Sequence, residues 1–140
     1  MKNERIDLGH VEIDVLKNGN LIYLNVYGEF TDDDVIAMTK YLENFFDEIS
    51  GPTIRVWDST NISSDQFKIT AKGTDQFNQW SGRMKKKWPG NIAYLIADKP
   101  LSFGISRMYE LKTSDHDLPI IVLRNFDKLP DNIKARIPRI

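Results

Sequence analysis

A single-domain α/β fold with a mixed five-stranded sheet is the architecture that this sequence predicts. Short apolar segments alternate with segments of helical periodicity along most of the chain. The first two apolar segments are joined by a tight turn. Strands that alternate with helices indicate a largely parallel sheet, whereas a tight turn indicates an antiparallel hairpin. A chain of 140 residues is expected to form one domain over residues 1–140.

An N-terminal antiparallel hairpin is predicted from residues 10–27. Residues 10–16 alternate polar and apolar side chains, which is typical of a half-buried strand. The segment Asn18-Gly19-Asn20 follows, and these residue types accept positive φ angles at little cost. Residues 21–27 then form the returning strand.

The first helix is predicted to begin at Thr31, whose side chain can cap free backbone N–H groups. Three aspartates follow at residues 32–34, where the helix dipole favours negative charge. Apolar residues then recur at helical spacing as far as Ile49, and Gly51-Pro52 ends the helix. A short strand over residues 54–58 comes next.

The second half of the chain continues the alternation. A long helix is expected over residues 64–87, and Gly73 lies within it at a cost of about 1 kcal/mol relative to alanine. The remaining predicted elements are a strand at 92–97, a helix at 101–113, a strand at 119–124 and a final helix at 128–136.

The N-terminal strands predict that helices lie mainly on one face of the sheet. A sheet covered on both faces reads as nearly continuous Val, Ile and Leu, whereas these strands alternate. We therefore expect a helix-free face that carries Tyr23, Tyr27, Arg55 and Trp57. Aromatic residues and arginine are enriched at protein interfaces, which favours a homodimer through this face. The alternative is that the aromatic residues cover the sheet of a monomer.

The composition excludes several function classes. The net charge is −1, which disfavours a strongly basic nucleic-acid-binding protein. The charge is uneven, however: residues 1–70 carry 6 basic and 13 acidic side chains, and residues 71–140 carry 13 and 7, which favours a complementary self-contact. Without cysteine there is no disulfide, zinc-thiolate site or thiol nucleophile.

Targeting segments and catalytic motifs are absent from the sequence. The polar N-terminus does not resemble a signal peptide, and no apolar run approaches the roughly 20 residues of a membrane span, so we expect a cytoplasmic protein. Phosphate-binding glycine motifs and the nucleophile elbow are missing, which predicts a protein without enzymatic activity or cofactor. We interpret His116, between two aspartates, as part of a solvated turn rather than a cation site.

Three residues are candidates for a ligand cleft. Asp58 and Asp98 end two predicted parallel strands, where α/β proteins usually bind ligands, and Arg107 lies in the helix that follows Asp98. A basic cluster, Arg83, Lys85, Lys86 and Lys87, ends the long helix. Cations complement the dipole there, which is the favoured reading; contact with an anionic lipid or nucleic acid is the alternative.

Ser63 and Ser64 are candidates for a helix cap or for phosphorylation. Ser63 and Gln66 have the spacing of a capping box at the start of the long helix. The alternative is phosphorylation, because a phosphate at an exposed helix start is favourable and visible to a partner.

The layout resembles the SpoIIAA-like (STAS) fold, and the second half is most similar to the small bacterial proteins of the STAS/SEC14-like group. Residues 91–98, 103–110 and 120–127 carry the resemblance, together with Gly28-Glu29-Phe30-Thr31. The resemblance implies a β-α superhelix without a catalytic centre that binds other proteins. It also implies a phosphorylatable serine in the loop that contains Ser63 and Ser64, although the acidic residue and glycine that flank it in the anti-sigma antagonists are missing.

Two hypotheses for function follow. The first is a non-catalytic, dimeric interaction or regulatory domain. The second is a small-ligand or lipid-binding domain with its cleft at the strand ends, which a cavity of about 300 Å³ or more would favour.

Overall fold

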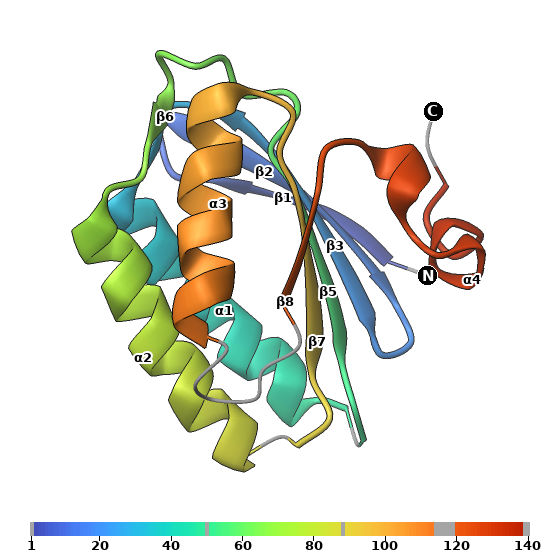
Figure 1. The fold of residues 1–140 in the computed structure, drawn as a ribbon. Helices are drawn as coiled ribbons and strands as arrows, with labels where there is room; N and C mark the ends of the chain where they lie inside the picture. The colour runs from blue at the N-terminus through green and yellow to red at the C-terminus, as the bar shows by residue number, and fades with distance from the viewer. Residues whose placement is uncertain (1, 50, 88, 114–119, 139–140) are drawn as a thin grey trace.

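The computed structural model describes residues 2–49, 51–87, 89–113 and 120–138, which adopt a mixed α/β fold (Figure 1). One sheet contains six strands in the order β1-β2-β3-β5-β7-β8, and β4 pairs with β6 in a second, two-stranded sheet. The strands are β1 (Lys2–Asp7), β2 (Val11–Asn18), β3 (Leu21–Gly28), β4 (Phe30–Thr31), β5 (Ile54–Asp58), β6 (Phe67–Lys68), β7 (Ile92–Ile96) and β8 (Ile120–Leu123). The helices are α1 (Asp32–Asp47), α2 (Ala71–Lys87), α3 (Pro100–Thr113) and α4 (Asp131–Lys134), and the 3₁₀ turn η2 (Phe126–Lys128) lies before α4.

The large sheet is antiparallel at its N-terminal side and parallel elsewhere. Strand β2 runs antiparallel to β1 and β3, and β3, β5, β7 and β8 run parallel to one another. The hairpin predicted between β2 and β3 is confirmed, and Gly19 adopts a φ of 61° in its turn. The expected alternation of strands and helices is also present.

The sheet has six strands rather than the five predicted, because β1 was not anticipated. Its sequence is mostly charged and shows no apolar alternation. Strand β1 pairs along the edge of β2, where the Arg5 guanidinium bonds the carboxylates of Asp14 at 2.6 Å and Glu12 at 2.7 Å. Cross-strand ion pairs, together with the backbone ladder, therefore hold this edge in place.

Helix α1 begins as predicted, with Thr31 as its N-cap. The Thr31 hydroxyl accepts a hydrogen bond from the backbone N–H of Asp34, and the Asp34 carboxylate accepts one from the backbone N–H of Thr31. This reciprocal pair is a capping box. His10 also contacts the buried Asp34 carboxylate at 2.9 Å, which ties the start of α1 to the hairpin.

Helix α2 begins at Ala71 and not near residue 64, so the expected start was wrong. Ser63 and Gln66 instead close a turn. The N–H and the hydroxyl of Ser63 donate to the side-chain oxygen of Gln66, and the Ser63 carbonyl accepts the Gln66 N–H. The chain then enters β6, which pairs in parallel with β4. Gly73 consequently lies in the first turn of α2 rather than in its middle.

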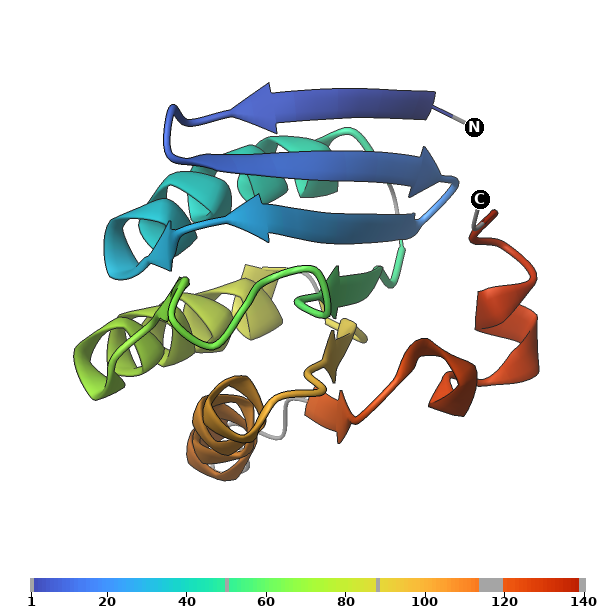
Figure 2. The same cartoon turned by 90° about the horizontal axis from the view of Figure 1, so that it is seen from above.

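One face of the large sheet is covered by three long helices, and the other face is covered in part. Helices α1, α2 and α3 pack on one face, and the C-terminal segment with η2 and α4 lies against the other (Figure 2). The three long helices therefore do lie on one face, but the opposite face is not helix-free. Within the described ranges, no helix has both the length and the apolar character that crossing a membrane requires.

Candidate ligand pocket

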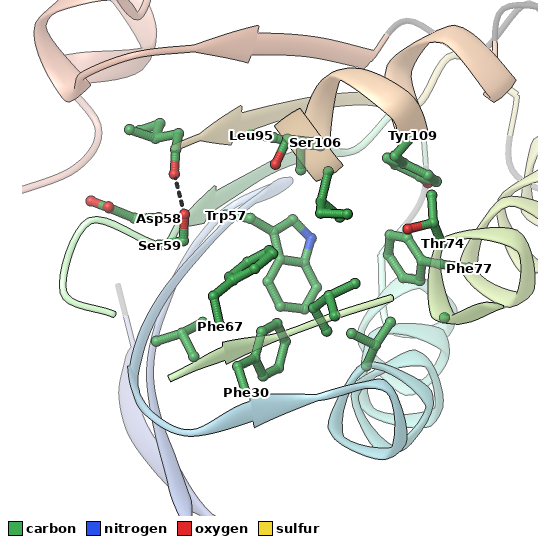
Figure 3. A pocket seen from close by; sticks show the side chains of 16 residues that line it. Phe30, Trp57, Asp58, Ser59, Phe67, Thr74, Phe77, Leu95, Ser106 and Tyr109 are labelled. Carbon is green, nitrogen blue, oxygen red and sulfur yellow. Dashed lines mark hydrogen bonds between the residues drawn. The ribbon is translucent and has the colours of Figure 1, made fainter. Parts of the chain in front are cut away.

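An apolar pocket of about 90 Å³ opens where β5 and β7 end, between the sheet, α2 and α3 (Figure 3). Aromatic side chains form much of its wall: Phe30, Trp57, Phe67, Phe77 and Tyr109. The carboxyl ends of parallel strands are the usual position of ligand sites in open α/β sheets.

Each wall of the pocket comes from a different element. The pleat of β5 directs Trp57 toward the helices, and α2 and α3 contribute Phe77 and Tyr109. The short β4–β6 pair brings Phe30 and Phe67 together across 37 residues of sequence. The two-stranded sheet therefore forms the wall of the pocket that faces Trp57.

The aromatic rings contact one another in a chain along the wall. The ring centroids of Phe30 and Trp57 are 6.1 Å apart, those of Trp57 and Phe77 are 6.1 Å apart at 90°, and those of Phe77 and Tyr109 are 5.1 Å apart. Edge-to-face and tilted pairs of this kind fix the ring positions. The wall is therefore a preformed aromatic surface.

Asp58 belongs to the pocket by position, but its carboxylate is directed to the opposite face of the sheet. It is completely buried and accepts hydrogen bonds from the Tyr23 hydroxyl at 2.5 Å and from the Thr60 hydroxyl at 2.6 Å. Adjacent residues of a strand point to opposite faces, which explains why Trp57 and Asp58 separate. The acidic group is thus turned away from the pocket (Figure 3).

The structure does not bring Asp58, Asp98 and Arg107 together in a cleft. Asp98 lies on the surface and pairs with Lys99 at 2.9 Å. Arg107 is exposed on α3 and pairs with Glu110 one turn later. Neither side chain lines the pocket, although the pocket does occupy the predicted place at the strand ends.

The expected helix-free face of Tyr23, Tyr27, Arg55 and Trp57 is wrong. In the parallel register, Tyr23 lies beside Val56, so Tyr23 and Arg55 are on opposite faces. Arg55 and Trp57 are 3% and 8% exposed beneath the helices, and Tyr23 is 7% exposed beneath the C-terminal segment. Only Tyr27 is half-buried, with the Arg5 guanidinium 5.8 Å from its ring centroid.

Arg55 has an unusual environment at the back of the aromatic wall. Its guanidinium lies 5.6 Å from the Phe77 ring centroid and 5.2 Å from that of Trp80. Burial lowers the pKa of Arg55, while the neighbouring Tyr109 opposes that shift. Burial likewise raises the pKa of Tyr109, and its interactions with Arg55 and Ser81 act in the opposite direction.

The serine and lysine candidates lie on the surface. Ser63 and Ser64 are exposed in the loop before β6, and the Ser63 hydroxyl donates to Asp65 at 2.5 Å. Neither caps α2, so the cap prediction is wrong; phosphorylation stays a prediction. The basic residues do end α2, and Lys87 pairs with Asp47 at 3.5 Å. His116 lies outside the described residues.

Of the pocket residues, sequence reasoning assigned only Asp58 to a ligand cleft, and it assigned Trp57 to a dimer face. Phe67 and Phe77 both fall within the single helix predicted over residues 64–87, and no binding role was assigned to them. The signal available was the clustering of aromatic residues next to the strand ends. No protein-family model matches this chain, and no curated protein is significantly similar to it in sequence.

Proposed function

We propose that this protein is a binding domain for a small apolar ligand, which occupies the pocket between β5, β7, α2 and α3. The observation that carries the proposal is a partly open apolar pocket with an ordered aromatic wall at the carboxyl ends of parallel strands. Pockets of this type bind ligands mainly through hydrophobic and aromatic contacts.

The volume limits the size of the ligand. About 90 Å³ is well below the roughly 300–1,000 Å³ of sites for drug-sized molecules, so the pocket does not reach the volume that was expected of a ligand or lipid cleft. A lipid tail would not fit without rearrangement of the core. We therefore propose a ligand the size of one aromatic ring or a short acyl chain.

The protein-interaction hypothesis has lost its main support. Arg55, Trp57 and Tyr23 are buried within the chain, so they are not available to a second copy in this structure. The homodimer, the regulatory partner and the SpoIIAA-like relationship stay proposals. The last is supported by the N-terminal hairpin, the parallel order β3-β5-β7-β8 and the three helices on one face.

Binding of toluene, followed by NMR chemical shifts, tests the proposed function. We expect the resonances of Trp57, Phe77 and Tyr109 to shift in a saturable manner. Ser106 lines the pocket, so Ser106→Leu should fill it and weaken binding at least tenfold. Gly104→Leu is the matched control, because a side chain there meets open space on the same helix.

Two results would contradict the proposal. The first is that toluene and comparable neutral aromatic compounds shift no pocket resonance. The second is that Ser106→Leu and Gly104→Leu bind toluene as well as the wild type does, which would place the binding elsewhere.

A further inference from the structure

Arg55 is a buried cation without a carboxylate partner among the described residues. The residue is 3% exposed, and its Nε and Nη1 groups have no hydrogen-bond partner. Arg55 is in none of the ion pairs of the described ranges, and the Tyr109 side chain is its hydrogen-bond partner and electrostatic neighbour. Buried charges are normally paired and fully hydrogen-bonded, because desolvation of an ion is costly.

The aromatic rings around Arg55 compensate for only part of this cost. The faces of Phe77 and Trp80 both lie within 6 Å of the guanidinium, the distance at which cation–π attraction acts. This attraction does not satisfy the in-plane N–H groups, which need acceptors. Within the described residues, the site therefore still lacks a negative group and acceptors for Nε and Nη1 of Arg55.

The unpartnered donors lie next to the pocket. Phe77 and Tyr109 line the pocket and also contact Arg55, so one layer of side chains separates the guanidinium from the cavity. Trp57 lines the pocket, and its indole Nε1 is also buried without a hydrogen-bond partner. Two separate residues thus present N–H groups without acceptors at the same wall.

The acidic groups near this wall are already engaged. The Asp58 carboxylate is on the other face of the sheet with Tyr23 and Thr60. Glu43 accepts the indole N–H of Trp80 at 2.7 Å, and neither residue lines the pocket. The positive charge of Arg55 is therefore uncompensated toward the cavity, where the low dielectric strengthens its attraction for an anion.

We infer that the ligand of this pocket is a small monocarboxylate, whose apolar part lies against the aromatic wall and whose carboxylate is drawn to Arg55 and Trp57. This inference rests on the proposed function and adds the chemical class of the ligand. Arg55 would act as the residue that selects an anion, and the aromatic rings would select its apolar part. A carboxylate in the cavity supplies the missing negative charge across the layer of Phe77 and Tyr109, and it supplies an acceptor for the indole N–H of Trp57.

Benzoate and benzamide form a matched pair of probes, because they share shape and differ in charge. We expect the dissociation constant for benzoate, measured by NMR titration, to be at least tenfold lower than that for benzamide. The preference should fall to about one in Arg55→Met, which keeps the length of the side chain. It should persist in Arg107→Met, which removes an exposed arginine from the helix that lines the pocket.

The outcomes separate the inference from the proposed function. If benzamide or toluene binds in the pocket and benzoate binds no tighter, the monocarboxylate inference is wrong and the apolar site stands. If none of the three compounds shifts a pocket resonance, both are wrong. The comparison of benzoate with benzamide on the wild-type protein decides between these results even if Arg55→Met fails to fold. A preference that survives in a folded Arg55→Met protein would also overturn the role of Arg55.

Discussion

Asp58 shows how a single buried carboxylate connects the strands of the sheet. Its two oxygens accept hydrogen bonds from Tyr23 on the neighbouring strand β3 and from Thr60 in the loop that follows β5. A hydrogen bond to a buried ionised group contributes more than one between neutral groups. The Asp58 side chain therefore has a structural role rather than the role in a ligand cleft that its position at a strand end suggested.

Replacement of Tyr23 by phenylalanine tests this role. We expect Tyr23→Phe to lower the free energy of unfolding by about 1–3 kcal/mol, because Asp58 loses a donor that water cannot replace. Tyr94→Phe is the control, since Tyr94 is similarly buried on the same face and its hydroxyl has no hydrogen bond among the described residues. Equal losses in urea denaturation of the two variants would contradict the prediction.

Tyr109 gives the protein a predicted sensitivity to alkaline pH. Burial raises its pKa above the ordinary value of 10.0. At pH values between the unfolded and folded pKa, the unfolded chain has released a proton that the folded protein retains, so stability falls as the pH rises above about 10. This contribution is constant at lower pH, where both states are protonated.

Urea midpoints measured at pH 8, 9, 10 and 11 test the pH dependence. We expect a smaller loss of stability at high pH for Tyr109→Phe than for the wild type. A residual loss should persist, because burial also raises the pKa of Tyr27 and Tyr94. Parallel curves for the two proteins would show that Tyr109 ionises as freely in the fold as in the unfolded chain.

The position of Arg55 and Trp57 could be predicted only in part. Alternation in β5 correctly grouped these two residues on one side of the strand and Val56 on the other. It does not say which side faces the helices. Both faces of the sheet are covered at β5, so aliphatic residues do not mark the helix side there, and Arg55 was assigned to the surface although it is buried.

At the level of the elements, Gly73 allows α1 and α2 to approach at their N-terminal ends. A Cβ atom at this position would overlap the carboxylate of Asp32. That carboxylate is held by Thr70, whose backbone N–H and hydroxyl donate to it at 2.9 and 2.6 Å. The side chain of Asp32 therefore cannot move aside without loss of two hydrogen bonds.

We expect Gly73→Ala to lower the free energy of unfolding by about 1–3 kcal/mol, because overlap with Asp32 outweighs the better helix propensity of alanine. Gly104→Ala, in α3, is the control. A side chain there meets nothing within 4 Å, so stability should rise by up to about 1 kcal/mol. Thermal denaturation measures both changes, and a gain in both variants would contradict the proposed close approach.

The two helix caps predicted from the sequence, at Thr31 and at Ser63, have different outcomes, and a pair of variants tests this. Thr31→Ala should cost about 1 kcal/mol, because Thr31 caps α1. Ser63→Ala should change the free energy of unfolding by less than about 0.5 kcal/mol, since Ser63 is exposed and caps no helix. Urea denaturation that shows equal losses would mean that the turn at Ser63 matters as much as a true cap.

The sequence predicted most elements, and its errors have local causes. Ser63 and Gln66 make only one bond of a capping box, from the Ser63 N–H to the Gln66 side chain, and the Gln66 N–H donates to the Ser63 carbonyl in an isolated turn. Strand β1 has no apolar face of its own and depends on the free edge of β2, which a local pattern does not reveal. The pocket arises from pairing of β4 with β6, two strands of two residues each.

For the molecule as a whole, the free edge of β1 is poorly suited to pairing with a second copy. In an antiparallel pair, two facing residues either both direct their N–H and C=O groups toward the other strand or both direct them away from it. These orientations alternate along a strand, so when two identical strands pair regularly, one residue must lie opposite its own copy. The two registers with the longest overlap centre on Glu4 and Arg5, and like charges face each other in both. The predicted homodimer would therefore need a surface other than this edge.

The C-terminal segment completes the fold by covering part of the second face of the sheet. Phe126, Leu129, Ile133 and Ile137 pack with Tyr23 and other sheet residues in one buried cluster. Helix α4 has four residues, too few for a stable helix in isolation, so packing must hold it in place. Loss of this packing would expose buried side chains of β3, β5 and β7 together.

Ile133→Ala tests whether the fold depends on this cover. Ile133 is 4% exposed, so we expect a loss of about 2–5 kcal/mol in the free energy of unfolding, from lost burial and from the cavity that remains. Ile36→Ala makes the same chemical change at an α1 residue that is 37% exposed, and it should cost less than about 1 kcal/mol. Binding of the dye ANS should rise in the Ile133 variant alone, because a loosened segment uncovers the apolar cluster around Tyr23. If both variants lose the same stability and bind the dye equally, the segment would be a peripheral tail, and the inner face of the sheet with its three long helices would be sufficient for folding.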